Sequence, residues 1–250
     1  MAIQKTQGFV LRRDDIRETS ILLTAYTRDF GKIKLISKGV RSPEQRFISA
    51  YEILALDDLV FYERKKGDFF LLSQCELVNF FPKIREALDR ISYASYFCEF
   101  LNAVTQAGDI NADLYELLFN TLALLSTDAS PKRVARIFEI RILSILGLMP
   151  SLKQCVGCEK EIDKEKTRFS LRLGGALCDR CFSRDKGARP ILAGSINFIS
   201  HIESMPFDRI KHIKVAKRVG GEVERLLRAF INYHLDIRLR SREFITKVGV

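Results

Sequence analysis

Histidine is scarce in this chain of 250 residues, and tryptophan does not occur at all. The three histidines, His201, His212 and His234, follow no spacing typical of a metal site or a catalytic triad. The phosphate-binding patterns GxxxxGK[ST] and GxGxxG and the nucleophile pattern GxSxG are also missing. Asp57 and Asp58 are adjacent, so on a strand their carboxylates point to opposite faces and do not chelate one ion. We therefore expect a protein without enzymatic activity.

Long hydrophobic runs are missing as well. A membrane-spanning helix needs about 18 or more consecutive apolar residues, and the sequence has no such stretch. The residues after Met1 lack the apolar segment of a signal peptide. Cys75 and Cys98 have no obvious partners, which favours a reducing compartment. The sequence predicts a soluble, cytoplasmic protein that interacts with no membrane.

The other four cysteines form two CxxC pairs, Cys155 with Cys158 and Cys178 with Cys181. Two such turns brought together place four thiolates around one Zn²⁺, at bond lengths of about 2.3 Å. Four thiolates leave no open position for water, so a site of this kind is structural rather than catalytic. Two disulfides or unrelated free thiols are the alternatives. The spacing favours one structural Zn²⁺ within residues 151–190.

Basic side chains outnumber acidic ones, with 41 Lys and Arg against 31 Asp and Glu and a net charge of +10. The excess is concentrated in residues 151–190 and 205–250, whereas residues 81–150 are nearly neutral. A basic surface attracts phosphate backbones, and that attraction weakens steeply with salt. Solubilising charge, or a basic face for an acidic protein, would produce the same composition. The charge favours nucleic acid as a partner.

A two-residue period of apolar side chains dominates the first 80 residues. The predicted strands are 8–11, 21–26, 32–38, 53–62 and 69–77. Five short strands are typical of an OB-fold barrel, and an SH3-like barrel is the competing interpretation. From residue 83 the period changes to three and four residues, which indicates amphipathic helices.

Capping residues predict helix starts at Asn111, at Ser130-Pro131 and at Ser195, and a longer helix is expected over 211–234. The predicted fold class is α+β and multidomain. A five-stranded OB-fold barrel that binds nucleic acid occupies 1–80. A mainly α-helical domain occupies 81–250 and carries the inserted four-cysteine zinc motif at 151–190.

Basic side chains gather on one face of the predicted third strand and in the loop after it. On a strand, alternate residues share a face, so these side chains can follow a phosphate backbone. The predicted DNA contacts are Lys32, Lys34, Lys38, Arg41 and Arg46. A plain solvated edge is the alternative. A second candidate patch near the C-terminus is Arg238, Arg240 and Arg242, which is equally typical of a tail that packs on a neighbouring domain.

Several short motifs, in the expected order and spread over nearly the whole chain, resemble the RecO family of bacterial DNA repair proteins. They are Glu18-Thr19-Ser20, Gly31-Lys32-Ile33-Lys34, Ser37-Lys38-Gly39-Val40-Arg41-Ser42, Arg136-Ile137-Phe138-Glu139, the two CxxC pairs and Leu239-Arg240-Ser241-Arg242-Glu243-Phe244. The paired cysteines are similar to those of the zinc-bearing members of the family.

The resemblance implies a non-catalytic recombination mediator. Members bind single- and double-stranded DNA without sequence specificity and anneal complementary strands. They help to load RecA onto strands coated by single-stranded-DNA-binding protein (SSB), together with RecR and in some bacteria RecF. By position, Lys32, Lys34, Lys38 and Arg41 fall on the family's basic DNA-binding strand and loop, and Arg136 falls near its SSB-tail site.

Two other classes of function remain open at this point. One is a zinc-stabilised scaffold whose basic faces dock acidic proteins. The other is a zinc-ribbon enzyme that processes nucleic acid, which would need clustered carboxylates or an open metal site.

Overall fold

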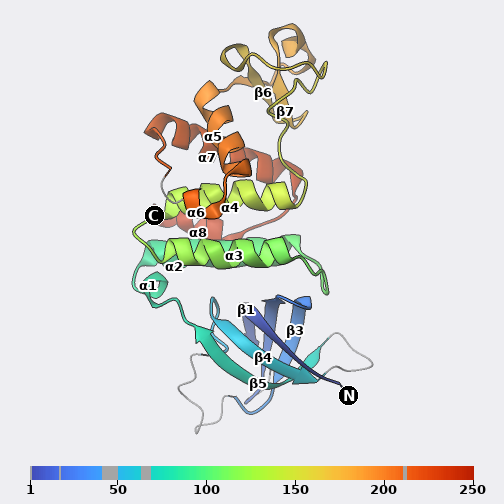
Figure 1. Cartoon of the computed structure of the whole chain (residues 1–250), viewed down its shortest axis with the longest axis vertical. Helices are drawn as coiled ribbons and strands as arrows, with labels where there is room; N and C mark the ends of the chain where they lie inside the picture. Colours follow the sequence, from blue (N-terminus) through green and yellow to red (C-terminus); the bar gives the residue numbers. More distant parts are fainter. Residues whose placement is uncertain (1, 17, 41–49, 63–68, 211–212) are drawn as a thin grey trace. The chain divides into compact units, whose positions relative to one another are not determined.

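The computed structural model describes residues 2–16, 18–40, 50–62, 69–210 and 213–250 (Figure 1). Internal contacts divide the chain into two compact units. The first, Met1–Pro131 with Leu239–Val250, is called the barrel unit, and the second, Lys132–Arg238, is called the cysteine unit. Packing units and independently folding domains are different properties, so the domain boundary at residue 80 stays a prediction.

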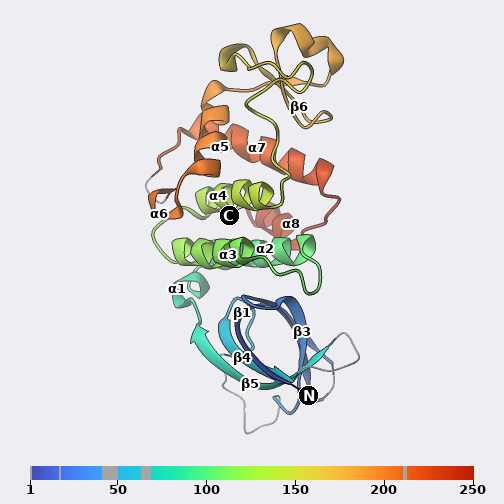
Figure 2. The same cartoon turned by 45° about the vertical axis from the view of Figure 1, so that its right-hand side comes forward.

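Five strands of the barrel unit close into a barrel in the order β1-β2-β3-β5-β4 (Figures 1 and 2). They are β1 (Ile3–Asp15), β2 (Ile21–Thr27), β3 (Gly31–Ser37), β4 (Leu56–Tyr62) and β5 (Phe70–Asn79). Neighbouring strands are antiparallel, except that β3 and β5 pair in parallel over a short register. This is the five-stranded barrel of an OB-fold, so the predicted fold class is confirmed.

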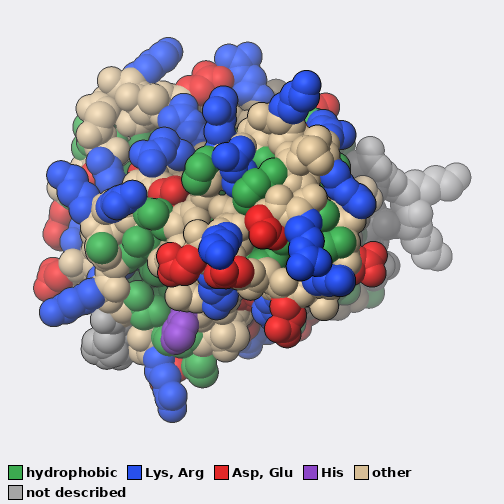
Figure 3. Space-filling model, turned by 90° about the horizontal axis from the view of Figure 1, so that it is seen from above, with side chains coloured by type: hydrophobic (Ala, Val, Ile, Leu, Met, Phe, Trp, Pro, Cys, Tyr) green, Lys and Arg blue, Asp and Glu red, His purple; other side chains and the backbone are tan. Residues whose placement is uncertain are grey.

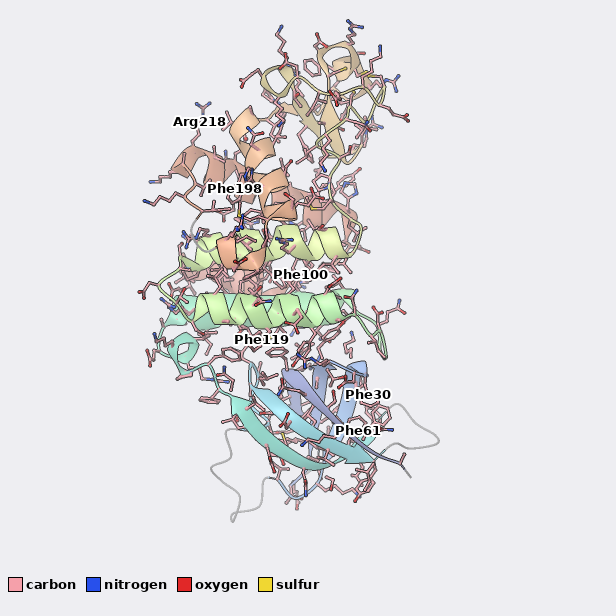
Figure 4. The ribbon with its side chains drawn as sticks, viewed as in Figure 1. Phe30, Phe61, Phe100, Phe119, Phe198 and Arg218 are labelled. Carbon is pink, nitrogen blue, oxygen red and sulfur yellow. The ribbon has the colours of Figure 1, made fainter. Side chains whose placement is uncertain are left out.

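The core of the barrel follows from the alternation along each strand. Ile33 and Leu35 of β3 are buried, whereas Lys34 between them is exposed. Phe61 of β4 is completely buried, and its ring meets Phe30 edge-on at 5.3 Å between centroids (Figure 4). These aromatic side chains fill part of the barrel core, in keeping with the large area that aromatic rings bury in protein cores.

Two helices, α2 (Leu88–Val104) and α3 (Ala112–Leu125), lie against the barrel (Figure 2). Phe9 of β1 packs on Tyr115 and Phe119 of α3, at centroid distances of 5.3 and 6.5 Å. Asn111 caps α3 as predicted, because its side chain accepts a hydrogen bond from the Leu114 N–H at 3.1 Å. The sequence thus places this helix correctly.

The helix predicted from residue 83 is divided in the structure. A short α1 (Pro82–Arg85) precedes α2, and the backbone at Ala87 is extended, with φ −135° and ψ 132°. A further helix, α8 (Arg240–Val248), packs on α2 and was not predicted. The carboxylate of Glu99 on α2 accepts hydrogen bonds from the Arg240 and Ser241 N–H groups at the start of α8, at 2.9 and 2.8 Å.

The cysteine unit combines helices with a small sheet of order β7-β6-β8. The strands are β6 (Arg168–Ser170), β7 (Gly175–Leu177) and β8 (Arg189–Pro190), flanked by the 3₁₀ turns η2 (Lys164–Lys166) and η3 (Asp179–Arg184). The helices are α4 (Pro131–Ile145), α5 (Ala193–Ser204), α6 (Phe207–Ile210) and α7 (Lys217–His234). α4 begins at Pro131, as predicted. Within the described ranges, no helix is long and apolar enough to cross a membrane.

Ser195 does not cap α5, contrary to the prediction. The helix begins at Ala193, and the Ser195 hydroxyl donates to the carboxylate of Glu222 on α7, at 2.5 Å. The same carboxylate accepts a hydrogen bond from the Leu192 N–H at 2.9 Å. A charged side chain from a neighbouring helix therefore replaces the local cap.

Two arginine side chains bind carbonyl groups at the C-terminal ends of α3 and α5. Arg90 donates to the carbonyl oxygens of Leu125 and Thr127 at the end of α3. Arg141 donates to Glu203 O, at 2.9 Å, and to Met205 O after α5. Cations at helix C-termini satisfy carbonyl groups that have no intrahelical partner. The net charge of +10 therefore overstates the positive charge that is available to a partner.

Candidate nucleic-acid interface and metal centre

Lys34 and Lys38 are the exposed members of the predicted DNA-binding set that the structure describes. Lys34 lies in the middle of β3, and its ammonium is 5.6 Å from the centre of the Phe69 ring. Lys38 follows directly after the strand. Ammonium groups beside an aromatic ring are the combination by which proteins hold a phosphate backbone and stack a base.

Lys32 is engaged within the barrel unit. Its ammonium donates to the carbonyl oxygens of Asn102, at 2.7 Å, and Thr105, at the end of α2. Burial, followed by repulsion from Lys34, lowers the pKa of Lys32 below its ordinary value. Lys32 therefore joins β3 to α2. Of the remaining members of the set, Arg41 and Arg46 lie outside the described residues.

The C-terminal candidate patch is divided between the two units. Arg238 is the last residue of the cysteine unit and is exposed. Arg240 and Arg242 belong to α8 in the barrel unit. Arg240 is exposed, whereas Arg242 is half-buried with its guanidinium 5.8 Å from the centre of the Tyr96 ring. α8 thus contributes packing on α2 as well as charge.

Arg136, the predicted SSB-tail contact, lies in a nearly buried ion pair. One guanidinium nitrogen is 2.9 Å from a carboxylate oxygen of Glu139, which is completely buried. Another is 3.7 Å from Glu224 on α7. Arg136 is only 8% exposed, so in this conformation it chiefly holds α4 and α7 together and offers little surface to a peptide.

The four cysteines of the CxxC pairs meet in one cluster, with all four sulfur atoms within 4.8 Å of one another. They are free thiols, not disulfides. Cys158 Sγ and Cys178 Sγ are 3.7 Å apart. A tetrahedral ion with metal–sulfur bonds of about 2.3 Å sets its ligands about 3.8 Å apart. The cluster therefore fits a tetrahedral metal ion.

The surrounding backbone prepares the cluster for a cation. The Gly157 and Cys178 N–H groups each donate to Cys155 Sγ at 3.3 Å. Burial raises the pKa of Cys155, but the N–H groups of Cys178, Gly157 and Cys158 outweigh it and lower the pKa to about 6. Burial and the neighbouring sulfurs raise the pKa of Cys181 to about 12. Four thiolates in this space repel one another, and a bound cation removes that repulsion.

Gly157 lets the first CxxC turn close on the cluster. A Cβ at this position would lie 3.0 Å from Cys181 Cβ and 3.1 Å from its sulfur. This approach explains why a glycine stands between two ligands.

Asp57 is a buried carboxylate that sequence reasoning did not single out as a core residue. One of its oxygens accepts the Tyr51 N–H at 3.1 Å and the Cys75 thiol at 3.3 Å. Burial raises the pKa of Asp57 to about 6. The signal was in the sequence, because Asp57 shares the two-residue period of the core residues Leu59 and Phe61.

This raised pKa predicts a pH-dependent stability. A carboxyl group whose pKa is higher in the folded than in the unfolded state stabilises the fold at low pH, and that contribution is lost as pH rises through about 6. Between pH 4.5 and 7.5 we expect the wild type to lose about 2 kcal/mol relative to Asp57→Asn. Urea unfolding of both proteins at each pH tests this. A constant difference between them would show that Asp57 keeps an ordinary pKa.

Comparison with known proteins agrees with this architecture. The family model described as "Recombination protein O N terminal" matches residues 1–81, and "Recombination protein O C terminal" matches residues 85–243. The chain belongs to the recombination protein O (RecO) family. The two family models together span the barrel, the helices around it and the cysteine cluster.

Curated members of the RecO family match along almost their whole length. A DNA repair protein RecO from Moorella thermoacetica is 33% identical over 98% of this chain and 91% of its own. One from Pelotomaculum thermopropionicum is 32% identical over 100% and 96%. One from Symbiobacterium thermophilum is 31% identical over 98% and 97%.

Proposed function

We propose that this protein is a non-catalytic recombination mediator in DNA repair. It binds single- and double-stranded DNA without reading the sequence and anneals complementary strands. The observation that supports this most is the full-length match to RecO proteins combined with a barrel that presents Lys34 and Lys38 to solvent. Contacts to the backbone carry no sequence information, so such binding is non-specific and sensitive to salt.

The four-cysteine cluster holds one structural Zn²⁺ in this proposal. The donor set favours zinc, since four thiolates in tetrahedral arrangement are its typical structural site. Bound zinc would neutralise the thiolates and fix the two CxxC turns against each other. With no open ligand position, it would take no part in chemistry.

The proposed protein partners are those of the family: RecR, SSB, RecA, and RecF in some bacteria. In this proposal the protein helps, together with RecR, to load RecA onto SSB-coated single strands. Family membership supports these partners. Arg136 would reach an SSB tail only after leaving its ion pair with Glu139. The exposed lysines Lys34 and Lys38 are therefore more accessible to a partner than Arg136 is.

Reversing the charge of Lys34 and Lys38 is expected to weaken DNA binding while leaving the fold intact. Both side chains are exposed, and each lost phosphate contact lowers the salt slope for a single strand by about 0.7. For Lys34→Glu with Lys38→Glu we expect a slope lower by about 1.4 and an affinity on the order of tenfold weaker. Fluorescence anisotropy with a labelled oligonucleotide, over a range of salt concentrations, measures both.

The matched control is Lys5→Glu with Lys83→Glu, because both lysines are exposed in the barrel unit and lie off β3. This control makes the same change in net charge and is expected to have a much smaller effect. If both double variants bind equally well at low salt, β3 is not the interface.

A further inference from the structure

A groove of about 500 Å³ lies within the cysteine unit, between the small sheet and α7. Pockets of 300–1,000 Å³ are the usual size for binding a small ligand. The bottom of the groove is apolar, and one arginine lies on each side, Arg189 on the sheet and Arg225 on α7. The residues that define it are Phe169, Leu171, Arg189, Ile191, Arg225 and Leu226.

The register of the sheet explains the arrangement. Phe169 of β6 pairs with Arg189 of β8, so the two side chains share one face of the sheet. Phe169 also packs on Phe230 of α7, at 6.3 Å between ring centroids, so this is the face turned toward the helix. The Arg189 side chain therefore lines the sheet side of the groove, and the Arg225 side chain lines the α7 side. Arg168 lies on the other face, over the ring of Phe182.

The charge of the groove is positive. Of the described residues that line it, Glu222 is the only acid, and its carboxylate is already bound to the Leu192 N–H and the Ser195 hydroxyl. Arg189 and Arg225 are exposed, and neither has an ion-pair partner among the described residues. All ten Lys and Arg residues of 151–190 are exposed. Figure 3, viewed from the end of the molecule where β6 and β7 lie in Figure 1, shows many Lys and Arg side chains, with some Asp and Glu among them.

We propose that this groove binds single-stranded DNA, with a base against the apolar floor and neighbouring phosphates on Arg189 and Arg225. Guanidinium groups bind phosphate oxygens in pairs and also stack on bases. The groove is less suited to an extended peptide, which would have to pair with the edge strand of the sheet. The edge strand β8 is two residues long, and one of them, Pro190, has no N–H to donate.

The inference rests on the proposed DNA binding and extends it. Lys34 and Lys38 belong to the barrel unit, whereas Arg189 and Arg225 belong to the cysteine unit. One chain then has two separate surfaces for DNA strands. Holding two strands at once is the physical requirement of annealing, because the two backbones repel each other unless their charge is neutralised.

The test uses the full chain and counts bound strands. A fluorescein-labelled oligothymidine is titrated at low salt, and both stoichiometry and affinity are measured. The wild type is expected to bind two strands per chain. Arg189→Glu with Arg225→Glu and, separately, Lys34→Glu with Lys38→Glu are each expected to bind one strand with wild-type affinity and the second strand on the order of tenfold more weakly.

The matched control is Lys153→Glu with Lys160→Glu, which makes the same charge change at exposed positions of the cysteine unit outside the groove. It is expected to keep two strands. A groove variant that still binds two strands with wild-type affinity overturns the inference and leaves the proposed function standing. A wild type that binds no DNA overturns both. A groove variant that keeps wild-type DNA binding but no longer binds a labelled Asp- and Leu-rich peptide would assign the groove to acidic proteins instead.

Discussion

Replacing Cys158 by serine is expected to abolish metal binding and to unfold residues 151–190, while the barrel unit stays folded. The buried core around the cluster is small and consists of Leu177 and Ala188 with two of the cysteines themselves, Cys155 and Cys181. The strands next to it are two or three residues long. Structural zinc contributes about 10–16 kcal/mol in small peptides, which is more than such a core can supply.

Two measurements check this prediction: zinc content by a colorimetric chelator, and hydrogen exchange along the chain. Cys75→Ser is the control, because it removes a thiol outside the cluster and is expected to keep one zinc per chain. Binding of DNA through Lys34 and Lys38 should persist in part, since they belong to the barrel unit. A Cys158→Ser protein that stays folded and zinc-free yet loses all DNA binding would show that the cluster itself contacts DNA.

Gly31→Ala is expected to cost the barrel unit about 3 kcal/mol or more, through a left-handed backbone and a direct collision. Gly31 has φ +61°, and a Cβ there would lie 2.2 Å from the carbonyl oxygen of Asp109. The turn before β3 is thus pressed against the connection between α2 and α3. The Gly108 N–H also donates to Lys32 O at 2.9 Å, at the same contact.

Gly39→Ala separates the two causes. Gly39 has φ +74°, but a Cβ there would meet no atom of the described part of the chain within 4 Å. We expect this substitution to cost about 1 kcal/mol, from backbone strain alone. Urea unfolding of both variants measures the difference. Equal losses would mean that the chain around Asp109 moves aside without cost.

The sequence predicts local features of this protein well. The alternation of Ile33, Lys34 and Leu35 places β3 and its exposed face, and Asn111 marks the start of α3. The CxxC spacing brings the two sulfurs of each pair together, because each pair is formed by a turn of four residues. In each case the determining interactions lie within a few residues of one another.

Other features depend on partners that are distant in the sequence. Lys32 has the same pattern as Lys34, yet its ammonium is held by Asn102 O, 70 residues away. Glu99 meets the start of α8 across 141 residues, and Glu222 replaces Ser195 as the cap of α5. Periodicity describes which side of an element is polar. It does not say whether that polar side faces water or another element's unsatisfied backbone.

Salt-dependent anisotropy of the wild-type chain with labelled single-stranded oligonucleotides of unrelated sequence tests the central claim most directly. Non-specific binding to the phosphate backbone predicts equal affinities for the different sequences and a linear decrease of log K with log salt concentration, with a slope of about 0.7 for each phosphate contact. It is contradicted if no binding occurs at low salt, or if one sequence binds far more tightly than the others.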